Sequence, residues 1–177
     1  KNKNDEYNFE QLALSELYKV SLKGSSVPWL GSAMYQDISF SPDGEYIMIS
    51  AIKRPFSYLV PNNRFPSTRI IYTKEGQELN TVAQVPLMEN LPKGFMAVPS
   101  GRRSFRWRND QPASLIFVKA LDEGNPDSLV AFRDEVFQLE APFDQMPRSL
   151  LKTQNRFASI IWGNKNLAIA HDYWWNT

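Results

Sequence analysis

Short apolar stretches of the chain alternate with polar residues, and turn-forming residues separate one stretch from the next. Ile38 and Phe40 have polar neighbours, and an apolar run from Tyr46 to Ile52 follows the tetrapeptide Ser41-Pro42-Asp43-Gly44. A period of two indicates a β-strand, and proline at the second position with glycine at the fourth is typical of a tight turn. Residues 37–52 are therefore predicted to form an antiparallel hairpin.

The same pattern continues on both sides of this hairpin. A strand is expected from about Ser15 to Leu22, then a turn at 23–26 and a short strand in "VPWLG". The segment "NFEQLALSELYKV", which overlaps the start of this strand, also fits a helical spacing in part. Its first half therefore stays open between helix and strand. Further strands are predicted in "TRIIYT", "ELNTVAQV", "SFRW", "ASLIFVKAL", "DEVFQLEA", "RSLLKTQ", "FASIIW" and "LAIAHDYW".

The predicted strands recur in groups of four, and the aromatic residues Phe40, Trp107 and Trp162 each precede the first turn of a group. A repeated four-stranded unit that is covered by its neighbours is typical of a β-propeller. We therefore expect an all-β fold, an incomplete β-propeller made of four-stranded antiparallel blades. Residues 1–30 would end a preceding blade, residues 31–88 and 89–153 would form complete blades, and residues 154–177 would begin another, all within one truncated propeller domain.

Composition narrows the classes of partner. The 20 Lys and Arg residues are balanced by 19 Asp and Glu, so the excess of positive charge that binds nucleic acid is missing, and no nucleic acid partner is expected. No apolar run reaches eighteen residues, so no membrane span is expected. With no cysteine and the single histidine His171, which is interpreted as structural, neither a cofactor nor a metal site is predicted. Unpaired edges of an open sheet make edge-strand association of the chain possible.

Arginines gather in or beside the two long segments between predicted strands. They are Arg54, Arg64, Arg102, Arg103, Arg106 and Arg108. A guanidinium group binds a carboxylate through two charge-assisted hydrogen bonds, which makes these residues candidates for recognising an acidic ligand. The alternative is that they pair with Asp37, Asp43, Asp110 or Asp134, or lie in solvent. Tyr58 and Phe65 either line a peptide path or pin the long loop to the sheet.

Five segments carry a family resemblance: "SFSPDGEYIMIS", "RPFSYLVPNNRFP", "VPLMENLPKGF", "GRRSFRWRNDQPASLIFVKALDEGNP" and the stretch from "APFDQMPRSLL" to the end. Together, over roughly residues 12–177, they resemble the amino-terminal propeller of the glutamyl endopeptidase branch of the prolyl oligopeptidase family of serine peptidases. The resemblance implies a propeller that restricts access to a following α/β-hydrolase domain. The nucleophile of that family lies in a G-x-S-x-G turn. Because no such motif occurs here, no catalytic residue is assigned.

The resemblance thus implies a non-catalytic propeller portion, inactive alone, that gates and positions peptide substrates for a C-terminal α/β-hydrolase domain of the same protein. Arg64 is the first candidate for binding the glutamate side chain of a substrate, with Arg54, Tyr58 and Arg103 as further candidates. The alternative is a non-enzymatic β-propeller that serves as a binding scaffold, because a fold alone does not decide between these functions. The resemblance suggests either an exported bacterial enzyme, periplasmic or extracellular, or an organellar plant enzyme, and the location stays open.

Overall fold

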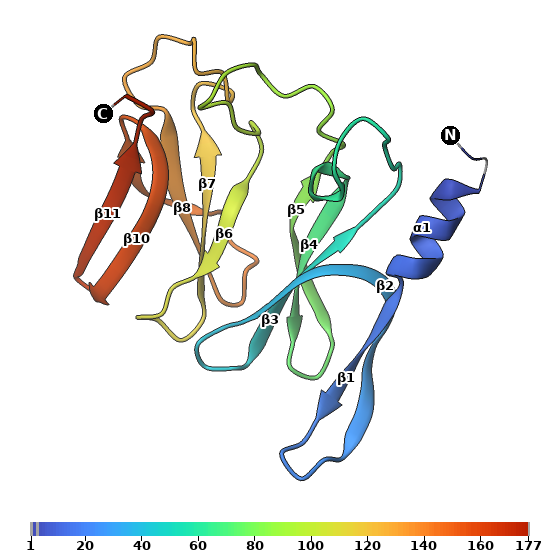
Figure 1. The fold of residues 1–177 in the computed structure, drawn as a ribbon. Helices are drawn as coiled ribbons and strands as arrows, with labels where there is room; N and C mark the ends of the chain where they lie inside the picture. The colour runs from blue at the N-terminus through green and yellow to red at the C-terminus, as the bar shows by residue number, and fades with distance from the viewer. Residues whose placement is uncertain (1, 3, 177) are drawn as a thin grey trace. The chain divides into compact units, whose positions relative to one another are not determined.

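A computed structural model of the chain describes residue 2 and residues 4–176 (Figure 1). The helices are α1 (Asp5–Ala13) and the 3-10 helix η1 (Asn62–Arg64). The strands are β1 (Ser15–Val20), β2 (Ser26–Phe40), β3 (Tyr46–Ile52), β4 (Ser67–Thr73), β5 (Glu78–Val85), β6 (Arg103–Trp107), β7 (Ser114–Ala120), β8 (Asp134–Glu140), β9 (Arg148–Thr153), β10 (Arg156–Asn164) and β11 (Leu167–Tyr173). The chain divides into two compact units, residues 1–39 with 45–87, and residues 40–44 with 88–177.

In the first unit, β1 to β5 form one antiparallel sheet whose spatial order is the order of the sequence. Short turns that contain Gly or Ser join β1 to β2, β2 to β3 and β4 to β5, whereas the longer loop of residues 53–66 joins β3 to β4. The turn at Ser41–Gly44 forms as predicted: the Gly44 amide donates to the Ser41 carbonyl oxygen at 2.9 Å, and Gly44 has a φ of 74°.

The strand predicted in "VPWLG" is much longer than expected. It is the first part of β2, a single strand of 15 residues that pairs with β1 and then continues to β3, as Figure 1 shows. The pairing register shifts between Leu30 and Ala33, so the strand passes through Gly31 and Ser32 as a bulge and does not end there. The blade boundary predicted between residues 30 and 31 therefore falls inside a continuous strand.

Helix α1 occupies the segment that the sequence left open between helix and strand. Asp5 and Glu6 lie in its first turn, where negative charge is favourable at the positive end of the helix dipole. None of its residues is fully buried, and only Phe9 and Ala13 pack against the cluster of Met34, Ile52 and Phe65. This narrow contact explains why the helical pattern is weak. Among the residues that the structure describes, no helix is long and apolar enough to cross a membrane.

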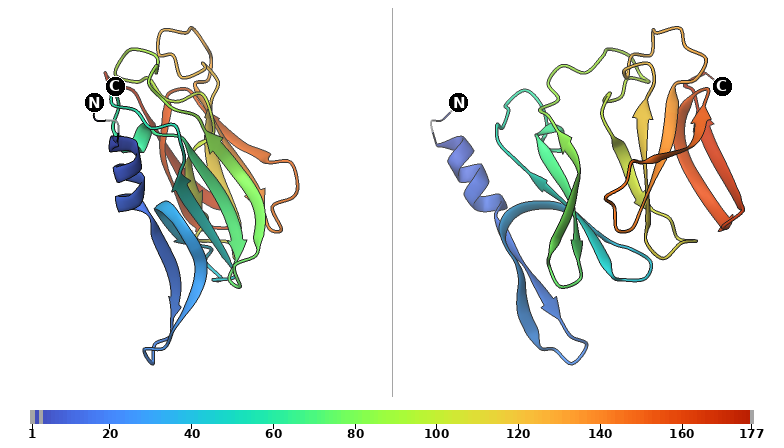
Figure 2. Two further views of the ribbon diagram at one scale, coloured as in Figure 1. Left: turned by 90° about the vertical axis from the view of Figure 1, so that its right-hand side faces the viewer. Right: turned by 180° about the vertical axis from the view of Figure 1, so that it is seen from behind.

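The second unit contains a four-stranded antiparallel sheet, β6 to β9 in sequence order, and the β10–β11 hairpin. Ile116, Val118 and Val136 of β7 and β8 form a buried cluster with Phe157 of β10. Leu150, Leu151, Ile160 and Trp162 pack around this cluster. The hairpin therefore covers an apolar face of the sheet, and β10 contacts β8. Figure 2 shows the hairpin, in orange and red, from two further sides.

The all-β prediction is confirmed at the level of strands and antiparallel sheets. The strand pairs predicted from residue 67 onward are all present. The sheet of β6 to β9 lies within the predicted blade of residues 89–153, and β10 and β11 lie within residues 154–177. In the part of the chain that the structure describes, the sheets are open and do not form a closed propeller. The propeller arrangement stays a prediction.

Candidate functional site

The long loop of residues 53–66, between β3 and β4, carries three of the four predicted site residues: Arg54, Tyr58 and Arg64. Its base is closed by a hydrogen bond from the Lys53 amide to the Pro66 carbonyl oxygen, at 2.7 Å. Phe65 turns inward and is only 8% exposed. The loop is therefore held at its ends by the sheet, which is the usual way in which binding residues are positioned.

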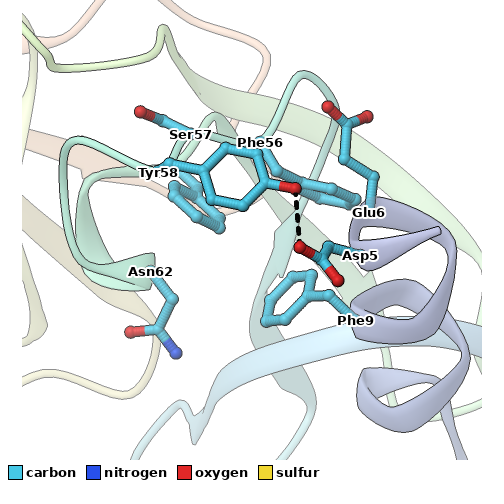
Figure 3. A pocket seen from close by; sticks show the side chains of 8 residues that line it. Asp5, Glu6, Phe9, Phe56, Ser57, Tyr58 and Asn62 are labelled. Atoms are coloured by element: carbon cyan, nitrogen blue, oxygen red, sulfur yellow. Dashed lines mark hydrogen bonds between the residues drawn. The ribbon is translucent and has the colours of Figure 1, made fainter. Parts of the chain in front are cut away.

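A pocket of about 260 Å³ lies between α1 and this loop (Figure 3). Its lining residues are Asp5, Glu6, Phe9, Phe56, Ser57, Tyr58, Asn62 and Phe65. The ring centroids of Phe9 and Phe56 are 4.9 Å apart, and those of Phe56 and Phe65 are 5.6 Å apart, in edge-to-face and tilted arrangements. The pocket thus combines aromatic walls with two carboxylates from the first turn of the helix.

Tyr58 lies at the edge of this pocket and is half exposed. Its hydroxyl donates a hydrogen bond to Oδ2 of Asp5 at 3.1 Å, the dashed line in Figure 3. Loss of water around the hydroxyl and the bond to Asp5 raise the pKa of Tyr58 above its ordinary value. Phe65, in contrast, pins the loop to the sheet, as the alternative interpretation of this residue predicted.

Arg54 is paired with the helix. Its guanidinium donates to Oε2 of Glu6 at 3.0 Å and to Oε2 of Glu10 at 2.6 Å, and it lies 5.1 Å from the ring centroid of Phe56. The hydrogen bond from Arg54 holds the pKa of Glu10 below its usual range. The sequence did not indicate these partners, because it left the segment that carries them open between helix and strand.

Arg64 is the last residue of η1 and is exposed. Its guanidinium makes no ion pair or hydrogen bond with any residue for which the structure gives a position. Of the three predicted site arginines, Arg64 is the one whose guanidinium is not already paired with a carboxylate of the described residues. A guanidinium in this state can donate two parallel N–H···O hydrogen bonds to one carboxylate.

Arg103 lies in the other unit, on β6, and donates to Oδ2 of Asp134, a residue that is fully buried on β8. Asp134 also accepts a bond from the buried Arg156 at 3.1 Å. Arg156 donates two further bonds, of 2.8 and 2.7 Å, to the carboxylate of Asp122, to which Arg133 adds one of 2.9 Å. The sequence offered Asp134 as a partner for the arginines, but it did not indicate that Arg156 and Arg133 bind Asp122.

The environment of Asp122 explains its charge state. Burial opposes ionisation, but the hydrogen bonds from Arg156, Arg133 and the Gly124 amide outweigh it, and the pKa of Asp122 is held below its usual value. The network ties the loop after β7 to β8 and β10.

Arg108 and Asp110 form a second paired set in the same unit, at 3.0 and 2.7 Å. The bonds from Arg108 lower the pKa of Asp110. The Arg108 guanidinium also lies 3.6 Å from the ring centroid of Trp162. For Arg103 and Arg108, the alternative prediction of pairing with Asp134 and Asp110 is confirmed.

The single histidine, His171, is exposed on β11, and its neighbour Asp172 accepts the Asn155 amide at 3.0 Å. Over residue 2 and residues 4–176, no three His, Cys, Asp or Glu side chains come together in a way that suits a metal ion.

Neither a family model nor a solved structure matches the chain. Two curated proteins match the chain. The chain is 36% identical to a "Probable glutamyl endopeptidase, chloroplastic" of Oryza sativa subsp. japonica over 178 residues, which cover 98% of this chain and 19% of the relative. It is 32% identical to a protein of the same name from Arabidopsis thaliana, and the match covers 98% of this chain and 18% of that relative. The chain spans about a fifth of the length of these relatives. Along nearly its whole length, it is thus related to one segment of proteins named glutamyl endopeptidase.

Proposed function

We propose that this chain is a non-catalytic β-propeller portion of a serine peptidase that gates and positions peptide substrates for a C-terminal α/β-hydrolase domain. The observation that carries the proposal is the identity of 32–36% with proteins named glutamyl endopeptidase over 98% of the chain. Its sequence has no G-x-S-x-G motif, so the nucleophile belongs elsewhere in the peptidase.

The packing of the second unit supports the propeller arrangement. In a propeller, successive antiparallel sheets stack face to face, and bulky side chains fill the space between them. Here the β10–β11 hairpin stacks on the β6–β9 sheet through Phe157 and Trp162, and Arg108 lies against the Trp162 ring. These contacts are of the kind expected between neighbouring blades.

Arg64 is proposed to bind the glutamate side chain of the substrate. Its exposed guanidinium makes no ion pair among the described residues, whereas Arg54 and Arg103 already contact carboxylates. An arginine with free N–H groups gains more from a new carboxylate than one whose partners must first be displaced. We propose a smaller contribution to substrate binding for the three further candidates, Arg54, Arg103 and Tyr58.

The test uses the protein of the full reading frame and matched peptides with glutamate or glutamine before the scissile bond. We expect cleavage after glutamate, and we expect Arg64→Gln to lower kcat/KM for the glutamate peptide about 10- to 100-fold, the effect of losing charge-assisted hydrogen bonds. The glutamine peptide should respond little. Lys23→Gln, which removes a positive charge at an exposed side chain in the turn between β1 and β2, is the control and should leave both rates unchanged.

Two further outcomes separate the parts of the proposal. Absence of any cleavage after glutamate contradicts the peptidase assignment and favours the non-enzymatic scaffold. Equal cleavage of a peptide and of a folded protein that displays the same sequence contradicts gating. Equal kinetics of the Arg64→Gln and Lys23→Gln variants contradict only the role of Arg64.

A further inference from the structure

We propose that the pocket between α1 and the loop of residues 53–66 binds the basic side chain, lysine or arginine, of a peptide. This inference concerns a site for positive charge, goes beyond the proposed function and does not rest on it. The pocket belongs entirely to the first unit, and Figure 3 shows its side chains.

The size of the pocket indicates a small occupant. Pockets that hold drug-sized molecules have volumes of about 300–1,000 Å³. With about 260 Å³, this pocket suits a single long side chain rather than a whole cofactor. Lysine and arginine bring an apolar stem that can pack on aromatic rings while the charged end reaches a polar rim.

The charge of the pocket selects a cation. Asp5 and Glu6 are its acidic side chains, and no Lys or Arg is among the lining residues that the structure describes. Oδ1 of Asp5 and Oε1 of Glu6 accept no hydrogen bond from any described residue, since the bonds from Tyr58 and Arg54 go to the other oxygen of each carboxylate. Arg54 also pairs with Glu10, so the described charged residues Asp5, Glu6, Glu10 and Arg54 together carry more negative than positive charge.

The aromatic walls add a second attraction for a cation. A guanidinium or ammonium group is attracted to the face of an aromatic ring within about 6 Å of its centroid. The ring of Phe56 already receives the Arg54 guanidinium at 5.1 Å. Phe9, Phe65 and Tyr58 provide further ring surface around the same space.

Other occupants fit less well. A hard metal ion takes six to eight oxygen ligands, and two carboxylates among aromatic rings do not provide them. An anion is repelled by Asp5 and Glu6. A wholly apolar group would take water from both carboxylates without replacing its hydrogen bonds, which is unfavourable.

The experiment measures peptide binding to the full-length protein by saturation-transfer NMR. The probe is acetyl-Gly-Lys-Gly-amide, which has no glutamate and so lies outside the proposed peptidase specificity. We expect the lysine methylene signals to receive the strongest saturation and the affinity to fall when salt is raised, because exposed charges are screened. A peptide with acetylated lysine should bind at least about threefold more weakly, through loss of the charge.

Variants then locate the site. The double variant Asp5→Asn, Glu6→Gln should weaken binding of the lysine peptide about three- to tenfold, the scale of two partly exposed charge contacts. Glu75→Gln removes an exposed carboxylate in the turn between β4 and β5 and should have no effect. Tyr58→Leu, which keeps both carboxylates but removes a ring, should also weaken binding. Circular dichroism checks that each variant is folded.

Three results would overturn the inference. One is equal binding of the lysine and acetyl-lysine peptides, which would leave only apolar contact. Another is unchanged binding in both the acidic double variant and Tyr58→Leu. The third is binding of a glycine peptide with a free amino terminus but not of the blocked lysine peptide, which would assign the pocket to a terminal ammonium. Because the probe is not a substrate, these results are independent of whether the protein cleaves after glutamate.

Discussion

Arg156 is 1% exposed, and its guanidinium joins the carboxylates of Asp122 and Asp134 while Nε donates to the Met96 carbonyl oxygen at 2.8 Å. Removing one partner of a buried ion pair leaves the other charge without compensation, which lowers the stability of the folded state by about 3–5 kcal/mol. We therefore expect Arg156→Met to lower the free energy of unfolding of the second unit by about this amount at pH 7. Arg156→Lys should recover only part of it, because an ammonium group cannot span two carboxylates as a guanidinium does.

The loss of unfolding free energy in Arg156→Met should depend on pH. The folded pKa of Asp122 is lowered, so its ionised form contributes stability that is complete above the ordinary value of 3.8 and is lost as pH falls through the folded pKa. Urea unfolding followed by tryptophan fluorescence at pH 7, 5 and 3 should show the difference between wild type and Arg156→Met shrinking only at the acidic end. Arg106→Met, at an exposed arginine, is the control. A difference that is constant from pH 7 to 3 would speak against an ionised Asp122 as its cause.

Helix α1 has nine residues, and isolated helices shorter than about 12–15 residues are marginal in water. Its attachment therefore depends on Phe9 in the cluster with Phe56 and Phe65 and on the exposed Arg54 bridges, which contribute less. We expect Phe9→Ala to detach the helix: the amides of residues 8–14 should exchange with deuterium faster, while those of β3 and β4 stay protected. Leu12→Ala, at a side chain that is 88% exposed, should change nothing. Equal exchange in both variants would contradict this account.

The strands were predictable because alternation and turn chemistry are local signals. Ser41-Pro42-Asp43-Gly44 sets a tight turn by itself, and the apolar runs of β3 and β7 have the length and the flanking turn residues that are typical of buried strands. The helix was not predictable to the same degree, since its apolar contact is limited to Phe9 and Ala13. The length of β2 was also hidden, because Gly31 suggests a strand end and instead lies at a bulge.

The candidate site was predictable only in part. The loop of residues 53–66 and its arginines stand out in the sequence, and Arg64 is indeed exposed there. The pocket depends on α1 folding back on that loop, a contact between residues about fifty positions apart, such as Tyr58 with Asp5. The pairing of Arg156 with Asp122 is likewise a long-range choice that no local pattern encodes. Charge partners of this kind follow from the tertiary fold.

For the molecule as a whole, the remaining question is whether the sheets are blades of a larger ring. The β10–β11 hairpin buries one set of side chains against the β6–β9 sheet, but Ile161, Leu167 and Ile169 remain about 60% exposed. Apolar residues gathered on one hairpin in this way usually contact a further element. In the proposed propeller, that element is the rest of the same blade or the next one, in the part of the peptidase that lies outside this chain.

Cysteine labelling tests this arrangement, since the chain has no native cysteine. In the 177-residue chain, Ile169→Cys and Leu129→Cys should both react rapidly with a thiol reagent, because Ile169 is 59% and Leu129 is 100% exposed. In the full-length protein, the proposed propeller predicts that the label at residue 169 slows at least about tenfold, as expected for a side chain that reacts only after local opening by 1.4 kcal/mol or more. Residue 129, in a loop, should stay reactive. If residue 169 instead reacts at the same rate in both proteins, this face of β11 is uncovered in the complete molecule, and the stacking of blades that supports the gating role ends at this hairpin.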